Sequence, residues 1–292
     1  MQRFGALEAG GTKMVMAVFS DDGQMLDRTS IPTQTPETTM PDMLAYFRSQ
    51  NICALGIGCF GPLDLHPSSE TFGSITMTPK LSWRMYPILR TFETELHVPA
   101  ALDTDVNGAA LAEVRLGAAR GLSSCLYVTI GTGIGGGVIM DGQPVHGLLH
   151  PELGHQLIPV SPDDPCPDGF CPYHKGCLEG LAAGPAMEKR WGMSAKVLPH
   201  DHRAWLLECE YIAVMCANAM LTFSPEKIIL GGGVMQQDFL FPLIRAKVLE
   251  RLNGYLTISS LDDYIVSPGL GVDSGITGAY LLARDALEHA KA

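Results

Sequence analysis

Two cysteines and a histidine lie within seven residues in the stretch CPYHKGC, at Cys171, His174 and Cys177. A second histidine, His155, stands in the preceding stretch HPELGHQ. Thiolate and neutral imidazole are good ligands of Zn²⁺, and four of them complete a tetrahedral site. We therefore predict that these four residues bind zinc. Because four protein ligands leave no position for water, the metal is expected to order the loop rather than to do chemistry.

The remaining cysteines leave alternatives open. Cys166 stands in polar sequence near the cluster and is a fifth candidate ligand. A disulfide or free surface thiols could replace the metal, although a reducing cytoplasm disfavours the disulfide. The other five cysteines lie in apolar runs, where a thiol serves as a small buried hydrophobic group; they are Cys53, Cys59, Cys125, Cys209 and Cys216.

Acidic residues end an apolar strand in LDTDVN, residues 102–107, and a helix is expected to start near Asp105. A carboxylate at the carboxyl end of a strand in an α/β sheet is well placed for a catalytic base. It could also cap the helix by accepting amide hydrogen bonds, and the two roles are compatible. We predict Asp105 as a general base and Asp103 as a supporting or metal-orienting acid.

Three glycine clusters could hold phosphate: GGTK at 10–13, GTGIGG at 131–136 and GGG at 231–233. GTGIGG matches the dinucleotide fingerprint by letter, but a strand follows it where that fingerprint requires a helix. Exposed backbone amides in a strand-glycine-strand turn can still bind phosphate. Each cluster alone could be only a tight turn. Two facing hairpins would grip a triphosphate, with Lys13 offsetting its charge.

The elements that position these residues follow one order twice, in residues 4–31 and 125–145: strand, glycine turn, strand, Asp-Gly turn, strand. We interpret this as an internal duplication of an α/β domain. Further strands are expected at 52–59 and 99–102 and in KIILGGG, and residues 150–182 as a loop insertion. Helices are expected at 37–50, 84–97, 105–119, 184–191, 202–221 and 238–253, and in the C-terminal stretch SGITGAYLLARDALEHA.

Composition limits the class of protein. The chain has 292 residues, 46% of them hydrophobic and 17% charged, which is typical of a folded protein of about two domains. Its net charge of −11 disfavours nucleic acid as a partner, because binding to phosphate backbones depends on Lys and Arg. No signal-peptide pattern and no membrane-length apolar run is found, so a cytoplasmic location is expected.

Eight motifs, in this order, resemble those of the ROK family of sugar kinases: EAGGTK, CFGPLDL, TPKLSW, DTDVNGAALAE, TIGTGIGGGVI, PELGH, GCLEG and GGGV. The resemblance covers essentially the whole chain. It implies duplicated α/β domains of the actin-like ATPase (ribonuclease H-like) fold, with ATP and sugar in the cleft between them. We place one domain at 1–118 plus the C-terminal helix at about 272–292, and the other at 119–271, with the zinc loop at about 150–182. A homodimer is also expected.

The resemblance further implies roles for single residues. Asp105 would take the proton of the sugar hydroxyl, and Mg²⁺ would bridge the β- and γ-phosphates of ATP. The sugar would be bound by Gly61, Pro62, Asp103, Asn107, Glu152, His155 and Glu179. The nucleotide would be bound by Gly10, Gly11, Thr12, Lys13, Thr132, Gly133, Gly231, Gly232 and Gly233.

Two departures from the glucokinase pattern indicate the sugar. His174 lies inside CPYHKGC, where many ROK glucokinases have a third cysteine, and Lys80 stands where they tend to have asparagine. This form resembles the bacterial fructokinase branch, which implies phosphorylation of D-fructose at its 6-hydroxyl. A broader hexokinase acting on glucose, mannose or N-acetylmannosamine remains open.

Two other classes of protein are disfavoured. A ROK repressor that senses sugar would need an added helix-turn-helix, for which the first phosphate loop at Glu8 leaves no room. A zinc-finger interaction module is also disfavoured, because the cluster is embedded in a two-domain enzyme pattern.

Overall fold

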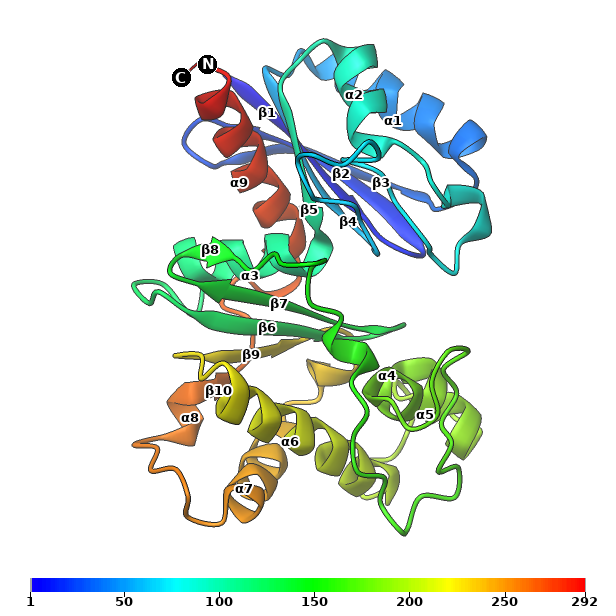
Figure 1. Cartoon of the computed structure of the whole chain (residues 1–292), viewed down its shortest axis with the longest axis vertical. Helices are drawn as coiled ribbons and strands as arrows, with labels where there is room; N and C mark the ends of the chain where they lie inside the picture. Colours follow the sequence, from blue (N-terminus) through cyan, green and yellow to red (C-terminus); the bar gives the residue numbers. More distant parts are fainter. Residues whose placement is uncertain (1, 292) are drawn as a thin grey trace. The chain divides into compact units, whose positions relative to one another are not determined.

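The chain forms two α/β units in the computed structural model, which describes residues 2–291 (Figure 1). Unit 1 runs to Arg115 and also contains Gln143–Pro151 and the C-terminal segment from Asp273. Unit 2 consists of Leu116–Gly142 and Glu152–Val272. The division expected from the sequence places residues 143–151 with the second domain, whereas in the structure this segment packs with the first.

The sheet of unit 1 has the strand order β3-β2-β1-β4-β5. Strands β1 (Arg3–Ala9), β2 (Lys13–Ser20) and β3 (Met25–Pro32) form an antiparallel meander, and β4 (Ala54–Cys59) and β5 (Ala100–Thr104) continue the sheet parallel to β1. The carboxyl ends of β1, β4 and β5 therefore meet at one edge. The first glycine loop leaves this edge after β1, and Asp105 leaves it after β5.

Helices cover both faces of this sheet (Figure 1). Helices α1 (Pro36–Gln50) and α2 (Ile88–Leu96) enclose the main apolar core on one face, and α9 (Ser274–His289) covers the other. Helix α3 (Asp105–Arg115) packs against α9 at a close crossing, where a Cβ atom on Gly278 would lie 2.0 Å from the Gly108 carbonyl oxygen. Glycine is therefore required at that crossing. The remaining short elements are η1 (Leu81–Trp83), η4 (Gly271–Asp273) and β8 (Gln143–Pro144).

The second sheet has the strand order β10-β9-β6-β7-β8. Strands β6 (Cys125–Ile130) and β7 (Ile134–Met140) form an antiparallel hairpin around the second glycine loop. Strands β9 (Ile228–Gly231) and β10 (Ile265–Val266) follow in parallel pairing. The helices are α4 (Leu178–Ala182), α5 (Gly184–Trp191), α6 (Ala204–Thr222), α7 (Leu240–Leu252) and α8 (Leu261–Tyr264), with short turns η2 (Leu153–His155) and η3 (Val234–Gln236).

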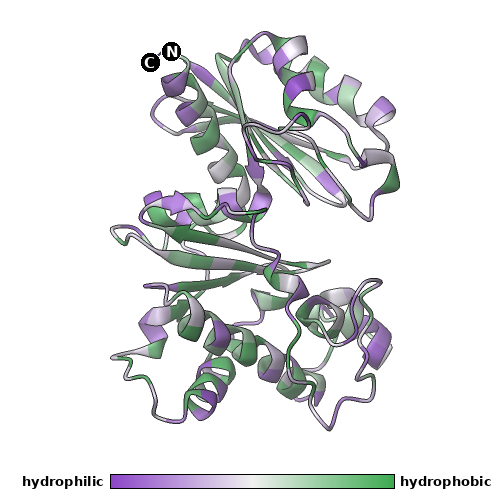
Figure 2. Ribbon diagram, in the orientation of Figure 1, coloured by the Kyte–Doolittle hydropathy of each residue, from purple (hydrophilic) through white to green (hydrophobic). Residues whose placement is uncertain are grey.

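Helix α6 is the one helix among the described residues long and apolar enough to cross a membrane by length and composition. However, 78% of its most apolar window is buried inside the protein, where it packs against α4 and α7. Figure 2 shows that hydrophobic residues are also abundant on the strands of both sheets. Burial of this kind is typical of a core helix, so α6 belongs to the core of unit 2.

The predicted α/β class and the repeated strand-glycine-strand hairpin are confirmed by the two sheets. Every predicted helix is present, although α2 starts at Ile88 rather than 84, because Met85 adopts a left-handed φ of 56° and Pro87 precedes the helix. Helix α3 ends at Arg115 rather than 119. Three elements were not predicted, namely α4 in the expected loop at 150–182, α8 and β10, which have five, four and two residues and are too short to show periodicity.

Candidate functional site

Asp105 is the first residue of α3, directly after β5. The side chain of Thr104 caps the helix by accepting the Asn107 N–H at 3.1 Å. The Asp105 carboxylate accepts the Val106 N–H at 3.0 Å. The capping role considered for Asp105 thus falls mainly to Thr104, which leaves the carboxylate at the sheet edge for other chemistry.

A second carboxylate, Glu8 at the end of β1, belongs to the same edge. The pKa of Asp105 is raised because the surrounding protein removes its carboxyl group from water. Burial and the charge of Asp105 raise the pKa of Glu8 to about 7, against the opposing charges of Lys13 and Arg28. Glu8 was not among the site residues predicted from the sequence. Its position before a glycine pair at a strand end was the available signal.

Asp103 is buried, and both of its carboxylate oxygens have polar partners within unit 1. Its Oδ1 accepts the Thr104 N–H at 2.7 Å and the Asn107 side-chain amide at 2.8 Å, and its Oδ2 lies 3.0 Å from His146 Nε2. The hydrogen bond to Asp103 raises the pKa of His146. No sequence signal marked His146, because its role depends on the return of segment 143–151 to unit 1.

Through His150 the same segment contacts Leu63, the residue after the predicted sugar-binding pair Gly61 and Pro62. The buried His150 accepts the Leu63 N–H at its Nε2, at 3.0 Å. Burial lowers the pKa of His150, in keeping with a neutral ring that acts as an acceptor. The Gly61–Pro62 peptide bond just before Leu63 is cis.

The first glycine loop is a tight turn held from one side. The Gly10 N–H donates to the Lys13 carbonyl at 3.0 Å, and Thr33 binds Gly10 through its hydroxyl and Thr12 through its N–H. A Cβ atom on Gly10 would lie 2.8 Å from the Lys13 carbonyl oxygen, so the turn requires glycine there. Gly11, Thr12 and Lys13 are exposed.

The second glycine loop lies against Glu179 within unit 2. The Glu179 Oε2 accepts the Ile134 N–H at 2.9 Å, and a Cβ atom on Gly133 would lie 2.6 Å from this oxygen. The turn Gly231–Gly233 packs on the same hairpin, since a Cβ atom on Gly232 would lie 2.5 Å from the Ile130 backbone nitrogen and oxygen. The predicted nucleotide residues of unit 2 are thus brought together with one predicted sugar residue.

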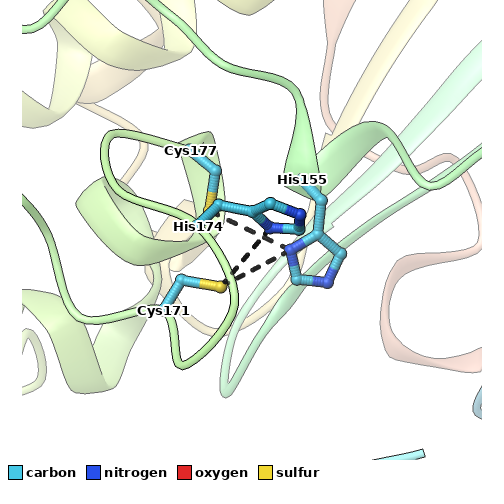
Figure 3. Close-up of side chains that lie close together, drawn as sticks. All are labelled: His155, Cys171, His174 and Cys177. Atoms are coloured by element: carbon cyan, nitrogen blue, oxygen red, sulfur yellow. Dashed lines mark hydrogen bonds between the residues drawn. The ribbon is translucent and has the colours of Figure 1, made fainter. Parts of the chain in front are cut away.

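His155, Cys171, His174 and Cys177 point toward one another (Figure 3). One ligand atom from each residue lies within 4.8 Å of all the others. Residues 156–158 pair with residues 176–178, because the Ile158 N–H donates to the Gly176 carbonyl and the Leu178 N–H to the Gln156 carbonyl. This pairing brings His155 next to the cysteine cluster. Among residues 2–291 Cys166 does not join the group.

The spacing of these atoms fits zinc. His155 Nδ1 lies 3.8 Å from Cys171 Sγ and 3.9 Å from Cys177 Sγ, and His174 Nδ1 lies 3.8 Å from Cys171 Sγ. Around a tetrahedral zinc with its usual bond lengths, sulfur and nitrogen ligands lie about 3.5 Å apart. The other ring nitrogen of His155, Nε2, lies 4.0 Å from Glu179 Oε1. A carboxylate behind a ligating histidine is a common orienting partner at zinc sites.

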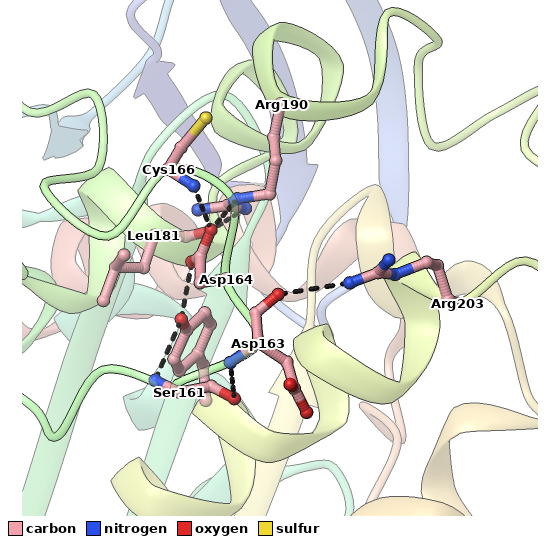
Figure 4. Close-up of polar contacts among 8 residues, drawn as sticks. Ser161, Asp163, Asp164, Cys166, Leu181, Arg190 and Arg203 are labelled. Atoms are coloured by element: carbon pink, nitrogen blue, oxygen red, sulfur yellow. Dashed lines mark hydrogen bonds and ion pairs between the residues drawn. The ribbon is translucent and has the colours of Figure 1, made fainter.

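A buried polar cluster holds the other end of the zinc loop (Figure 4). Asp164 accepts hydrogen bonds from Arg190 Nε at 2.8 Å, from the Cys166 N–H at 2.7 Å and from the Tyr211 hydroxyl at 2.6 Å. The side chains of Arg190 and Asp164 are 1% and 0% exposed. Breaking such a buried pair on one side commonly costs about 3–5 kcal/mol. This cluster fixes the loop to α5 and α6 independently of a metal.

The predicted site residues fall in both units. Unit 1 contains Gly10, Gly11, Thr12, Lys13, Gly61, Pro62, Asp103, Asp105 and Asn107. Unit 2 contains Thr132, Gly133, Glu152, His155, Cys171, His174, Cys177, Glu179, Gly231, Gly232 and Gly233.

Known proteins match this chain over its full length. The model of the ROK family matches residues 4–286. A fructokinase of Pediococcus pentosaceus is 47% identical over 286 residues, which cover 98% of this chain and 99% of that protein. A fructokinase of Zymomonas mobilis is 41% identical, with 96% of each chain covered. The crystal structure of a ROK hexokinase from Thermus thermophilus matches with a TM-score of 0.80 and 30% identity, over 100% of both chains. The predicted actin-like fold is thereby confirmed.

Proposed function

The chain belongs to the ROK family, and we propose that it is an ATP-dependent fructokinase that converts D-fructose and ATP to fructose 6-phosphate and ADP. The observation that carries this proposal is the match, over nearly the whole chain, to proteins named fructokinase at 41% and 47% identity. The carboxylate at the sheet edge and the two glycine loops supply the groups that phosphoryl transfer requires.

Asp105 is the proposed general base. It would accept the proton of the sugar 6-hydroxyl while that oxygen forms its bond to the γ-phosphorus and the bond to the bridging oxygen of ADP breaks. Burial raises the pKa of Asp105, and a higher pKa makes its carboxylate a stronger base. The amides of the glycine loops at 10–13 and 131–133 would donate to the phosphate oxygens.

Magnesium and zinc have different proposed roles. Mg²⁺ bound with ATP would neutralise charge on the β- and γ-phosphates, and Glu8 offers the kind of oxygen ligand that Mg²⁺ prefers. Zinc would be held by His155, Cys171, His174 and Cys177. Their thiolate and imidazole groups are the ligands that zinc prefers. The proposed role of zinc is structural, since the ion would hold the conformation of the loop that leads to Glu179.

The sugar is proposed to bind Gly61, Pro62, Asn107, Glu152, His155 and Glu179, with Asp103 orienting Asn107. Asn107 Oδ1 supports this, because it is buried and has no hydrogen-bond partner among the described residues. A sugar hydroxyl could supply the missing donor. Adenosine is proposed to lie near Gly231–Gly233.

Location and assembly are proposed separately. None of the eight cysteines, all of which lie within residues 2–291, forms a disulfide, in keeping with the reducing cytoplasm that we propose as the location. A homodimer is proposed as the working assembly.

A coupled assay of ADP release tests the function directly. The panel contains fructose, glucose, mannose and N-acetylmannosamine, each with and without Mg²⁺. We expect fructose to give the highest kcat/KM and turnover to require Mg²⁺. Similar kcat/KM values for several of these sugars would indicate the broader hexokinase instead. No turnover with any hexose would overturn the kinase assignment.

A further inference from the structure

The side chain of Lys80 reaches the first glycine loop within unit 1. A Cβ atom built on Gly11 would lie 3.3 Å from Lys80 Cε, the carbon that carries the ammonium group. Lys80 precedes η1 and is only partly exposed. The fold therefore brings a second lysine to the loop that Lys13 follows, from a segment distant in the sequence.

Hydrogen bonds on both sides fix the backbone of Lys80. Its N–H donates to Thr78 Oγ1 at 3.3 Å, and its carbonyl accepts the Trp83 N–H at 2.9 Å. Trp83 is 1% exposed and donates from Nε1 to the Gln34 carbonyl at 2.7 Å. A turn tied to a buried tryptophan holds its position well, so the site of Lys80 is built rather than incidental.

The same anchor reaches the glycine loop itself. Thr33, next to Gln34 in the chain, donates its hydroxyl to the Gly10 carbonyl at 2.7 Å and its N–H to the Thr12 carbonyl at 3.0 Å. The loop and the Lys80 turn are thus both attached to the segment that follows β3. Their relative position is fixed by direct hydrogen bonds within one unit.

The charges around the two lysines differ. The charge of Lys13 lowers the pKa of Glu8, so it already acts on that carboxylate. Lys80 forms no ion pair with any residue in the described part of the chain. An ammonium beside exposed loop amides and without a carboxylate partner is suited to an anionic ligand such as phosphate.

We propose that Lys80 is a catalytic residue whose ammonium contacts the phosphoryl group as it passes from ATP to the sugar. This inference rests on the proposed kinase function and names a residue of the same site. The sugar oxygen bonds to the γ-phosphorus, the bond to the bridging β,γ-oxygen breaks, and the hydroxyl proton goes to Asp105. Lys80 keeps its protons throughout and offsets charge on the transferred oxygens.

The test replaces Lys80 with methionine, which keeps an unbranched side chain beside Gly11 and removes the charge. We expect kcat with ATP and fructose to fall by about 10²- to 10³-fold, the usual loss when one transition-state donor is removed. The dissociation constant of fructose, measured by calorimetry, should change by less than about threefold. Lys80→Arg keeps the charge and should retain more activity than Lys80→Met.

Lys291→Met is the matched control, because it removes one exposed lysine from the same unit. Lys291 follows α9, and its charge acts to lower the pKa of the Cys53 thiol. Cys53 directly precedes β4, so it lies at the edge of the sheet opposite the first glycine loop. Its kcat should equal that of the unmodified protein. Lys80→Gln serves as a second neutral variant should thermal unfolding show that Lys80→Met does not fold.

The outcomes separate the two proposals. An unmodified protein without kinase activity would overturn the proposed function and this inference with it. An active protein whose Lys80→Met variant keeps kcat within about threefold would overturn the role of Lys80 alone. A variant with a raised KM for fructose and an unchanged kcat would also overturn the role of Lys80, because this result would make Lys80 a sugar-binding residue instead.

Discussion

Asp105, the proposed general base, lies at the sheet edge directly after a strand, and the neighbouring Thr104 caps its helix. Because Thr104 accepts the Asn107 N–H, loss of the Asp105 carboxylate does not remove the main cap of α3. The structural and chemical contributions of this position can therefore be separated by mutation.

The first prediction is that Asp105→Asn lowers kcat with fructose by about 10²- to 10⁴-fold, as is usual when a general base is lost. Thermal unfolding should remain near that of the unmodified protein, because the cap persists. Calorimetry should show that fructose and ATP still bind. Near-normal turnover in a variant that binds both ligands would contradict the assignment.

Glu8 gives a prediction about pH. Its pKa in the folded protein is about 7, against 4.5 as the reference value, so the folded state binds more protons between these values. Stability from this group therefore falls as pH rises from about 4.5 to about 7 and is constant above that. Glu8→Gln removes the titration. The melting temperature of the variant minus that of the unmodified protein should increase from pH 5 to pH 8.

A difference in melting temperature that stays constant over this pH range would contradict the raised pKa of Glu8. Asp21→Asn is a suitable control, since Asp21 is exposed. The melting temperature of Asp21→Asn minus that of the unmodified protein should not increase from pH 5 to pH 8 in the way expected for Glu8→Gln.

Some residues could be found from the sequence and others could not. The four metal-ligating candidates stand out because three of them occur within seven positions of a polar loop. His146 could not be found, since nothing in the letters VHG indicates that segment 143–151 packs on Asp103. Lys80 was noticed only as a departure from asparagine, and its place beside Gly11 follows from hydrogen bonds between distant segments.

At the scale of elements, the zinc loop is held at two places. The cluster of His155, Cys171, His174 and Cys177 closes one part, and the buried pair of Asp164 and Arg190 fixes the other. If zinc binds these four residues as proposed, its loss is expected to loosen the segment between the ligands rather than to unfold unit 2.

The corresponding prediction concerns zinc content. Cys171→Ser should reduce bound zinc, measured by atomic emission on the purified protein, from about one ion per chain to well below it. Cys166→Ser is the matched control and should keep the metal, because Cys166 lies with Asp164 instead. Equal loss in both variants, or zinc absent from the unmodified protein, would contradict the four-ligand site.

Helices and strands could be predicted from the sequence where an apolar pattern extends over many residues. Contacts between elements that are distant in the sequence could not. The hairpins of both units were evident from glycine turns between apolar runs. The close crossing of α3 and α9 was not, although Gly278 is essential to it. A glycine inside a helical pattern does not by itself reveal which backbone it faces.

At the scale of the whole molecule, the proposed reaction draws on residues from both units. The proposed base and the first glycine loop belong to unit 1, and the second glycine loop and the proposed zinc ligands belong to unit 2. The duplication could be inferred from the repeated hairpin. The placement of residues 143–151 in unit 1 could not, because that segment has no periodicity and is held by His146 and His150.

The last prediction follows from this division. If one bound pair of ligands uses residues of both units, fructose with a non-hydrolysable ATP analogue should slow hydrogen exchange in segments 8–13 and 131–134 alike. At ligand concentrations of 100 times Kd, binding contributes about 2.7 kcal/mol per site to the free energy of unfolding, which is ample to detect. The analogue alone should protect the glycine loops, and fructose alone should protect segments near Asn107 and Glu179. Protection confined to one unit under saturating amounts of both ligands would contradict a site that draws on both, because ligand contact must reduce amide opening wherever it forms.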